Sequence, residues 1–321
     1  MWESLPDNAI EITGLCKTYA GDSQQPPKTA LSDVDLVVPR GSFFGLLGPN
    51  GAGKSTMINI LAGLVIKTSG AARIWDFHIT EQMRQARSAI GVVPQELNID
   101  PFFTPREVLE TQAGLYGVPK AKRRTDEILA AMHLSDVADS YARSLSGGMR
   151  RRLLICKALV HSPPVLILDE PTAGVDVELR RSLWSYIREL RAAGTTILLT
   201  THYLEEAEEL CERIAIINHG RLVACETTED MLKKLESKTL IVTVDKDLDR
   251  VPNGMGNFKV EVRDGHMLVF HLPPGQMLVE QVLSAVHGAG LNINDLCTEE
   301  SDLEDIFLHL TQDEPTGEAS P

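Results

Sequence analysis

The sequence of 321 residues lacks any long apolar segment. No uncharged apolar run approaches the roughly 18 to 20 residues that a helix needs to cross a bilayer. The first ten residues contain acidic side chains and no basic side chain. Secretory signal peptides begin instead with a positively charged region. We therefore expect a chain that neither spans a membrane nor carries a signal peptide.

Cysteine is scarce and scattered. The five cysteines form no C-x-x-C pair, and their number is odd. This pattern favours reduced thiols in the cytosol and argues against a zinc site. His78, His133 and His161 also lack the spacing of metal ligands, so we expect them to be structural.

Basic residues are scarce only in the C-terminal part of the chain. From residue 236 onward there are 16 acidic and 5 basic residues, whereas the remainder has 29 acidic and 26 basic residues. Nucleic acid and anionic lipid would repel this C-terminal part. We expect it to be directed away from a membrane; a solvated, solubilising surface is the alternative. The composition, with 43% hydrophobic residues, is otherwise typical of one large or two moderate globular domains.

A phosphate-binding loop occupies residues 48 to 56. Its sequence, Gly48-Pro49-Asn50-Gly51-Ala52-Gly53-Lys54-Ser55-Thr56, fits G-x-x-x-x-G-K-[ST]. The apolar residues 43 to 47 before it predict a buried strand, and residues 56 to 64 predict a helix. Glycine lets the backbone amides turn onto phosphate oxygens, Lys54 is suited to reach phosphate, and Ser55 is suited to bind Mg²⁺. A glycine-rich turn without a ligand is the alternative.

Two carboxylates follow the apolar residues 165 to 168. Such a run predicts a strand that is buried on both faces, as in a parallel sheet. Asp169 and Glu170 then lie where that strand ends, which is where open α/β sheets bind ligands. Asp169 is suited to hold Mg²⁺ through water, and Glu170 to polarise an attacking water molecule. A surface Asp-Glu pair that opens a loop is the alternative.

Two further polar side chains follow predicted strands. Residues 90 to 93 lead into Gln95, and residues 196 to 200 lead into His202. Gln95 is suited to complete a Mg²⁺ shell and to orient water, and His202 to hydrogen-bond the γ-phosphate. Taken alone, each would be interpreted as a surface residue or as a core residue whose hydrogen bonds are made within the protein.

A second anion site is predicted at Ser146-Gly147-Gly148. These residues directly precede a helix expected over residues 149 to 161. A serine cap with glycines at a helix N-terminus favours bound anions. Because the chain already has one phosphate loop, we interpret this site as completing the site of a second protomer. A capped helix that binds nothing is the alternative.

In this order the motifs resemble the nucleotide-binding subunit of ATP-binding cassette (ABC) transporters, over about residues 8 to 235. Residues 48 to 56 match Walker A, Gln95 the Q-loop, residues 145 to 149 the signature, and residues 165 to 169 Walker B. The resemblance implies an α/β, P-loop NTPase fold with a RecA-like core and a helical subdomain. Met149 and Gly174-Val175 depart from the usual residues of the signature and D-loop, but neither change affects the phosphate chemistry.

The resemblance also assigns roles to single residues, with ATP and Mg²⁺ as the bound groups. It identifies Tyr19 as the aromatic that stacks on adenine, Asp176 as the D-loop aspartate and His202 as the switch histidine. Glu170 and His202 would serve catalysis, and Ser55, Gln95 and Asp169 would hold the metal. The residues implied to bind ATP are Tyr19, Gly48, Asn50, Gly51, Gly53, Lys54, Ser55, Thr56, Gln95, Ser146, Gly147, Gly148 and Asp176.

A finer resemblance is to the ATPases of ABC-2 type exporters. It depends on residues 147 to 153, 176 to 181 and 303 to 308. The group implies a head-to-tail homodimer, a separate membrane permease and a peripheral position on the cytoplasmic face of the inner membrane. A soluble cassette ATPase acting on ribosomes or DNA is the alternative function. The single cassette, the lack of a long coiled-coil insertion and the acidic C-terminal part disfavour it.

The pattern predicts three regions along the chain. The core is expected from residues 8 to 95 and 160 to 235, around a mainly parallel sheet, with a helical subdomain at about 96 to 159 that in the family contacts the permease. Residues 236 to 311 are expected to form a small acidic α+β module, and residues 312 to 321 a disordered tail. The elements expected in that module are strands near 240–244, 260–262, 268–272 and 292–297 and helices near 277–286 and 303–310.

Overall fold

The computed structural model describes residues 5–21, 26–172, 177–201, 203–233, 238–252, 255–256, 258–272 and 279–299. The chain separates into two compact units, Met1–Thr227 and Thr228–Pro321. The domain boundary expected near residue 235 stays a prediction, because residues 234–237 lie outside the described residues. The helix expected near 303–310 and the tail at 312–321 lie outside them as well.

A six-stranded sheet forms the centre of the first unit, in the order β10-β9-β3-β8-β7-β6. The five strands from β9 to β6 are parallel to their neighbours, and β10 is antiparallel to β9. Every residue of β3, β7 and β8 is buried, which explains their nearly uninterrupted apolar sequences. The strands are β3 (Phe43–Leu47), β6 (Ile90–Val93), β7 (Val165–Asp169), β8 (Thr196–Thr200), β9 (Arg213–Asn218) and β10 (Arg221–Thr227).

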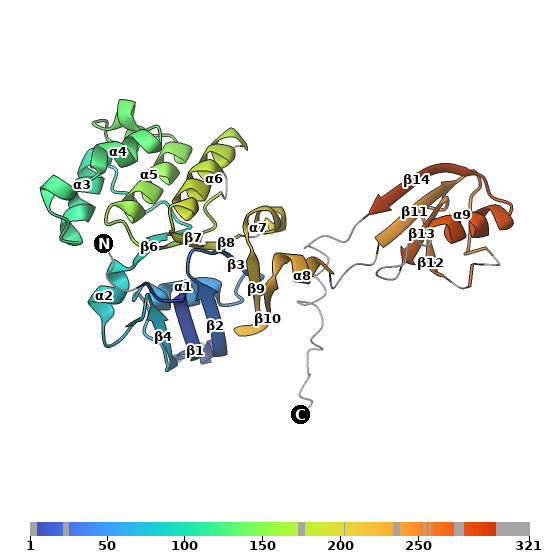
Figure 1. Cartoon of the computed structure of the whole chain (residues 1–321), viewed down its shortest axis with the longest axis horizontal. Helices are drawn as coiled ribbons and strands as arrows, with labels where there is room; N and C mark the ends of the chain where they lie inside the picture. The colour runs from blue at the N-terminus through green and yellow to red at the C-terminus, as the bar shows by residue number, and fades with distance from the viewer. Residues whose placement is uncertain are drawn as a thin grey trace. The chain divides into compact units, whose positions relative to one another are not determined.

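A second, antiparallel sheet lies in the same unit and was not predicted from the sequence. Its order is β2-β1-β4-β5, formed by β1 (Asn8–Tyr19), β2 (Lys28–Pro39), β4 (Ser69–Ile74) and β5 (Phe77–His78). Helix α1 (Lys54–Leu61) lies between the two sheets (Figure 1). One apolar core joins all three layers, since Ile10, Met57 and Phe44 belong to the same buried cluster.

The helical segment predicted between β6 and β7 is confirmed. It contains α3 (Pro105–Leu115), α4 (Thr125–Ala131) and α5 (Gly147–Leu159), with the short 3-10 helices η1 (Lys120–Lys122), η2 (Ser135–Val137) and η3 (Ala142–Ser144). Helices α3, α4 and α5 gather away from strands β1, β2 and β4 (Figure 1). Thr104 and Glu107 form a capping box that starts α3 at its proline. The remaining helices of the unit are α2 (Met83–Ser88), α6 (Val177–Ala192) and α7 (Leu204–Leu210).

The second unit contains an antiparallel sheet in the order β12-β13-β11-β14. Helix α9 buries Val282 and Val286 in the same apolar cluster as Phe270 of β13. The four strands and the helix expected near 277–286 are thus present. The elements are α8 (Thr228–Lys233), β11 (Lys238–Val244), β12 (Lys259–Arg263), β13 (Met267–Leu272), α9 (Val279–Gly288) and β14 (Ile293–Glu299). Among the residues described in both units, no helix is long and apolar enough to cross a bilayer.

Candidate functional site

The loop between β3 and α1 surrounds the ammonium group of Lys54. Lys54 Nζ donates hydrogen bonds to the carbonyl oxygens of Gly48, at 2.5 Å, and Pro49, at 3.2 Å. Burial lowers the pKa of Lys54, while the nearby carboxylates Glu170 and Asp169 act to raise it. A cation that is held by loop carbonyls inside a protein is a strong partner for an incoming phosphate.

Two glycines of this loop cannot carry a side chain. At Gly53, with φ +112°, an added Cβ would lie 2.6 Å from the carbonyl oxygen of Ala30. At Gly48 it would lie 2.3 Å from the carbonyl oxygen of Ile217. The loop is therefore pressed against β2 and β9, and this packing keeps its backbone close to the start of α1. Packing against these strands explains glycine at both positions, and the predicted reason, amides that turn onto phosphate oxygens, stays a prediction.

Asp169 and Glu170 lie at the end of β7, buried beside β8. Thr200, the last residue of β8, donates its hydroxyl to Asp169 Oδ1, and the parallel register pairs these two residues. Burial raises the pKa of Asp169, and the bond from Thr200 opposes that shift. Glu170 has a left-handed backbone, φ +47°, held by bonds from its amide to the Thr200 carbonyl and hydroxyl oxygens. Strained conformations of this kind cluster at functional sites.

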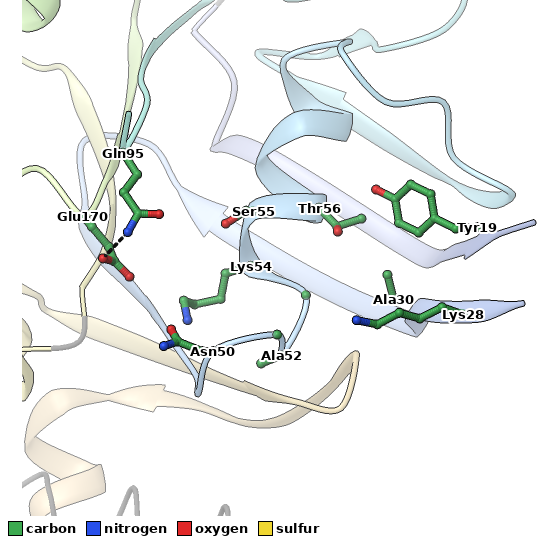
Figure 2. A pocket seen from close by; sticks show the side chains of 12 residues that line it. Tyr19, Lys28, Ala30, Asn50, Ala52, Lys54, Ser55, Thr56, Gln95 and Glu170 are labelled. Carbon is green, nitrogen blue, oxygen red and sulfur yellow. Dashed lines mark hydrogen bonds between the residues drawn. The ribbon is translucent and has the colours of Figure 1, made fainter. Parts of the chain in front are cut away.

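Gln95 reaches the same place from the end of β6. Its Nε2 donates to Glu170 Oε2 at 2.8 Å, as drawn in Figure 2. The sequence separation between the two residues is 75 positions, so only the sheet brings them together. Figure 2 shows Ser55, Lys54 and Asn50 on the same side of this pair, with Thr56 farther from it.

One pocket joins these groups to Tyr19. Tyr19 is 39% exposed at the end of β1, and Lys17 Nζ lies 4.7 Å from the centre of its ring. Lys28 and Ala30 of β2 lie beside it (Figure 2), and the sequence analysis did not name either residue. The residues that line this pocket are Tyr19, Lys28, Ala30, Asn50, Gly51, Ala52, Gly53, Lys54, Ser55, Thr56, Gln95 and Glu170.

Ser146, Gly147 and Gly148 begin α5 outside this pocket. The hydroxyl of Ser146 accepts a hydrogen bond from the amide of Met149 at 3.2 Å, which is the predicted N-cap. None of the three residues is among the described residues that line the pocket of Lys54. The two predicted phosphate sites of one chain are therefore separate. Asp176 and His202 lie outside the described residues.

The donor chemistry around Asp169 fits Mg²⁺. No group of three His, Cys, Asp or Glu side chains within the described ranges could hold a metal ion. Mg²⁺, however, is usually held in proteins by one or two carboxylates together with water and substrate phosphates. Ser55 and Gln95 line the pocket and supply oxygen donors of that kind, and Asp169 adds a buried carboxylate that is not among the described residues lining it.

Two side chains that support the site were missed in the sequence. Thr200 orients Asp169, and Arg151 donates to the carbonyl oxygens of Pro94 and Gln95 at 3.0 and 2.8 Å. Thr200 ends a predicted strand, and Arg151 lies in the motif at residues 147 to 153. Their contact partners, however, are visible only once the order of the strands is known.

Comparison with known proteins identifies the family. An ABC transporter family model matches residues 31–173. A Nod factor export ATP-binding protein I of Ralstonia nicotianae is 34% identical over 94% of this chain and 93% of its own length. A linearmycin resistance ATP-binding protein of Bacillus subtilis is 35% identical over 88% of this chain and 94% of its own. A daunorubicin/doxorubicin resistance ATP-binding protein of Streptomyces peucetius is 42% identical over 73% and 70%.

Solved structures agree with this assignment. The ATP-binding subunit of an ABC transporter is 31% identical with a TM-score of 0.64, over 70% of this chain and 92% of that one. A dimeric ATP-binding cassette in a post-hydrolysis state, bound to ADP and Pi, is 27% identical with a TM-score of 0.61, over 68% and 98%. With the P-loop, the paired carboxylates and the signature helix in place, the chain belongs to the ABC transporter family and is an ATP hydrolase of the ABC type.

Proposed function

We propose that this chain is the ATP-hydrolysing subunit of an ABC-2 type export system that works with a separate membrane permease. The names of three relatives support an outward direction, since they are called export or resistance proteins. The features quoted above for this group, at residues 147 to 153, 176 to 181 and 303 to 308, point the same way. The transported compound is a property of the permease and is not assigned.

The proposed working form is a head-to-tail homodimer. Each ATP would lie between the Lys54 loop of one copy and Ser146, Gly147 and Gly148 of the other. The observation that carries this proposal is the separation of the two anion sites within one chain. A capped helix N-terminus that lies outside the phosphate pocket of its own chain is suited to bind the phosphates of a nucleotide held by a partner. Dimeric cassettes among the related structures support the same arrangement.

Within this dimer the residues have distinct roles. Tyr19 would stack on adenine and Lys54 would bind the terminal phosphates, with the loop residues Gly48, Asn50, Gly51, Gly53 and Thr56 around them. Ser55, Gln95 and Asp169 would hold Mg²⁺, which neutralises phosphate charge when it is bound. Glu170 would polarise the attacking water. His202 would bind the γ-phosphate and Asp176 would face the partner.

Closure on ATP binding and opening after hydrolysis would move the permease. The chain would then act as a peripheral subunit on the cytoplasmic face of the inner membrane, and without nucleic acid as a partner. The charge of −11 from residue 236 onward supports the last point.

Isolation of the chain from its native cell tests the proposal. The tagged protein would be extracted from membranes in mild detergent, with Glu170→Gln and ATP used to hold the closed dimer. We expect a stoichiometric polytopic membrane protein to co-purify. Recovery only from the soluble fraction, with ribosomes, DNA or no partner, would contradict the transport assignment and favour a non-transport cassette ATPase.

A further inference from the structure

Arg151 lies at the junction of two parts of the first unit. It is 6% exposed and lies one helical turn after Gly147 on α5. Its Nη1 donates to the carbonyl oxygens of Pro94 and Gln95, 3.0 and 2.8 Å away. The two bonds fix the backbone that leaves β6 to the helix that begins with the Ser146 cap.

The environment of Arg151 is part of the hydrolytic site. Burial lowers the pKa of Arg151, and the charges of Glu170 and Asp169 act to raise it. Arg151 Nη1 donates its two hydrogen bonds to backbone carbonyl oxygens. A buried cation that donates hydrogen bonds to the backbone of a neighbouring segment holds that segment in place.

Gln95 carries the connection onward. While its carbonyl accepts from Arg151, its side-chain Nε2 donates to Glu170 Oε2 at 2.8 Å. A displacement of α5 would thus move the Gln95 backbone and, with it, the hydrogen bond that orients Glu170. Because the ring of Pro94 fixes its φ angle, the backbone just before Gln95 has little freedom to compensate for such a displacement.

The flanking arginines provide an internal comparison. Arg150 and Arg152 also donate to pairs of backbone carbonyls, but those carbonyls lie within the helical segment itself. The acceptors are Ala142 and Arg143 for Arg150, and Met132 and His133 for Arg152. Of the three consecutive arginines, Arg151 therefore makes the bonds to the strand end that carries Gln95.

We infer that Arg151 is a positioning residue that connects the signature end of α5 to Gln95 and, through Gln95, to Glu170 of the same chain. The inference rests on the proposed function, because α5 would contact the nucleotide of the partner. Nucleotide bound at the Lys54 loop of the partner would then affect the position of Glu170 in the copy whose α5 contacts it. Hydrolysis at the two sites is coupled by this route.

Steady-state ATP turnover of the full chain tests the positioning role. Arg151→Met keeps the length of the side chain and removes both hydrogen bonds. We expect kcat to fall roughly 10- to 100-fold, as small misplacements at reacting centres do, with KM for ATP within about twofold. Arg150→Met and Arg152→Met should lower the melting temperature by a similar amount and leave kcat within about twofold. Equal losses of kcat in all three variants would overturn the inference.

A double-variant cycle tests the path through Gln95. Gln95→Ala removes the bond to Glu170. Adding Arg151→Met to that variant should therefore lower its kcat by no more than about a further twofold. Multiplied losses in the double variant would show that Arg151 acts independently, and would overturn the path. Arg151→Lys retains the charge but has a single donor nitrogen in place of the planar guanidinium, so it should keep the melting temperature and give an intermediate kcat. A wild-type kcat in Arg151→Lys would also count against the inference.

The dimer is measured separately, so that the two proposals fail differently. ATP-dependent dimerisation of Glu170→Gln would be compared with that of Glu170→Gln combined with Arg151→Met. We expect both to dimerise, because Arg151 positions the water-activating group and does not contact ATP. If neither dimerises, the head-to-tail dimer is wrong and the coupling between sites is lost with it, while the cycle with Gln95 still decides the positioning role.

Discussion

At the scale of single residues, the site is a set of buried charges held by backbone groups. Lys54 is bound by two loop carbonyls and Arg151 by two carbonyls at the end of β6. Glu170 is anchored through its own amide to Thr200. Buried charges are stable only when they are paired or hydrogen-bonded, and here the backbone supplies those bonds. The charged ends are thus positioned before a nucleotide arrives.

Replacement of Lys54 tests the phosphate loop. Lys54→Ala removes a charge-assisted bond to phosphate, which contributes about 1.5 to 3 kcal/mol, so ATP affinity should fall roughly 10- to 100-fold. Isothermal titration with a non-hydrolysable ATP analogue measures it. Lys259→Ala removes an exposed lysine of β12 in the second unit and should bind as the wild type does. An unchanged affinity in Lys54→Ala would refute the phosphate role.

Replacement of Glu170 tests the water-activating role. Glu170→Gln keeps the size of the side chain and removes the basic carboxylate, so turnover should fall by about 10² to 10⁴. ATP binding should persist, and the ATP-bound dimer should accumulate on size-exclusion chromatography. Single-turnover hydrolysis distinguishes this loss from slow product release. Hydrolysis at the wild-type rate would show that another group activates the water.

At the scale of elements, the end of α5 is fixed to β6 and α3. His161 follows α5, its Nε2 bonds the carbonyl oxygen of Ile90 at 3.1 Å, and its ring stacks on Tyr116 at 3.7 Å. A bond to a carbonyl oxygen requires the proton on Nε2, which leaves Nδ1 as an acceptor. Nδ1 is buried with no hydrogen-bond partner among the residues that the structure describes, and burial lowers the pKa of His161 to about 4. The neutral imidazole is therefore the form that packs.

The sign of the resulting pH dependence follows from that shift. The unfolded chain takes up a proton on His161 near pH 6.5, whereas the folded chain takes it up only near pH 4. The free energy of unfolding should therefore fall by no more than about 3 kcal/mol as the pH decreases across this window. His161→Phe keeps the stacking and removes the titrating group, so its melting temperature should change less between pH 7.5 and pH 5.

A second histidine serves as the control for this experiment. His133→Asn replaces an exposed histidine with φ +52°, a conformation that asparagine tolerates, and should keep the wild-type pH dependence. If His161→Phe lost stability with acid as steeply as the wild type, the imidazole would not be the responsible group.

At the scale of the whole molecule, two apolar cores stabilise two units. The cluster that joins Phe44, Met57 and Ile10 contains described residues of the first unit alone. The cluster around Phe270 and Val282 contains described residues of the second alone. Units with separate cores unfold as separate cooperative transitions when each core is large enough. The pocket that we propose for the nucleotide, in turn, is lined by residues of the first unit.

Calorimetry of the full chain tests this independence. ATP with Mg²⁺ should raise one melting transition, because a ligand stabilises only the unit that binds it. Phe270→Ala should destabilise the other unit by about 3 to 5 kcal/mol and leave the ATP-sensitive transition in place. The matched change Phe44→Ala should affect the ATP-sensitive transition instead. A single transition that responds to both ATP and Phe270→Ala would contradict the independence.

Much of the local structure was predictable, since its causes lie within a few residues. Strands β3, β6 and β8 have the predicted bounds. The antiparallel sheet was missed for a physical reason. Strand β1 changes register against β2 at four places, so its apolar residues do not alternate regularly. A strand with such irregularities gives no clean period of two.

The sequence by itself determined the family and the polar residue that ends each strand, because motifs, caps and apolar runs are local. It determined that Asp169, Glu170 and Gln95 follow buried strands. Only the tertiary structure decided that Thr200 orients Asp169, 31 residues away, and that Arg151 holds Gln95, 56 residues away. Those contacts depend on the order of the strands and on the packing of α5 against β6. No spacing along the chain encodes them, since strand order is set by long-range burial over the whole sheet.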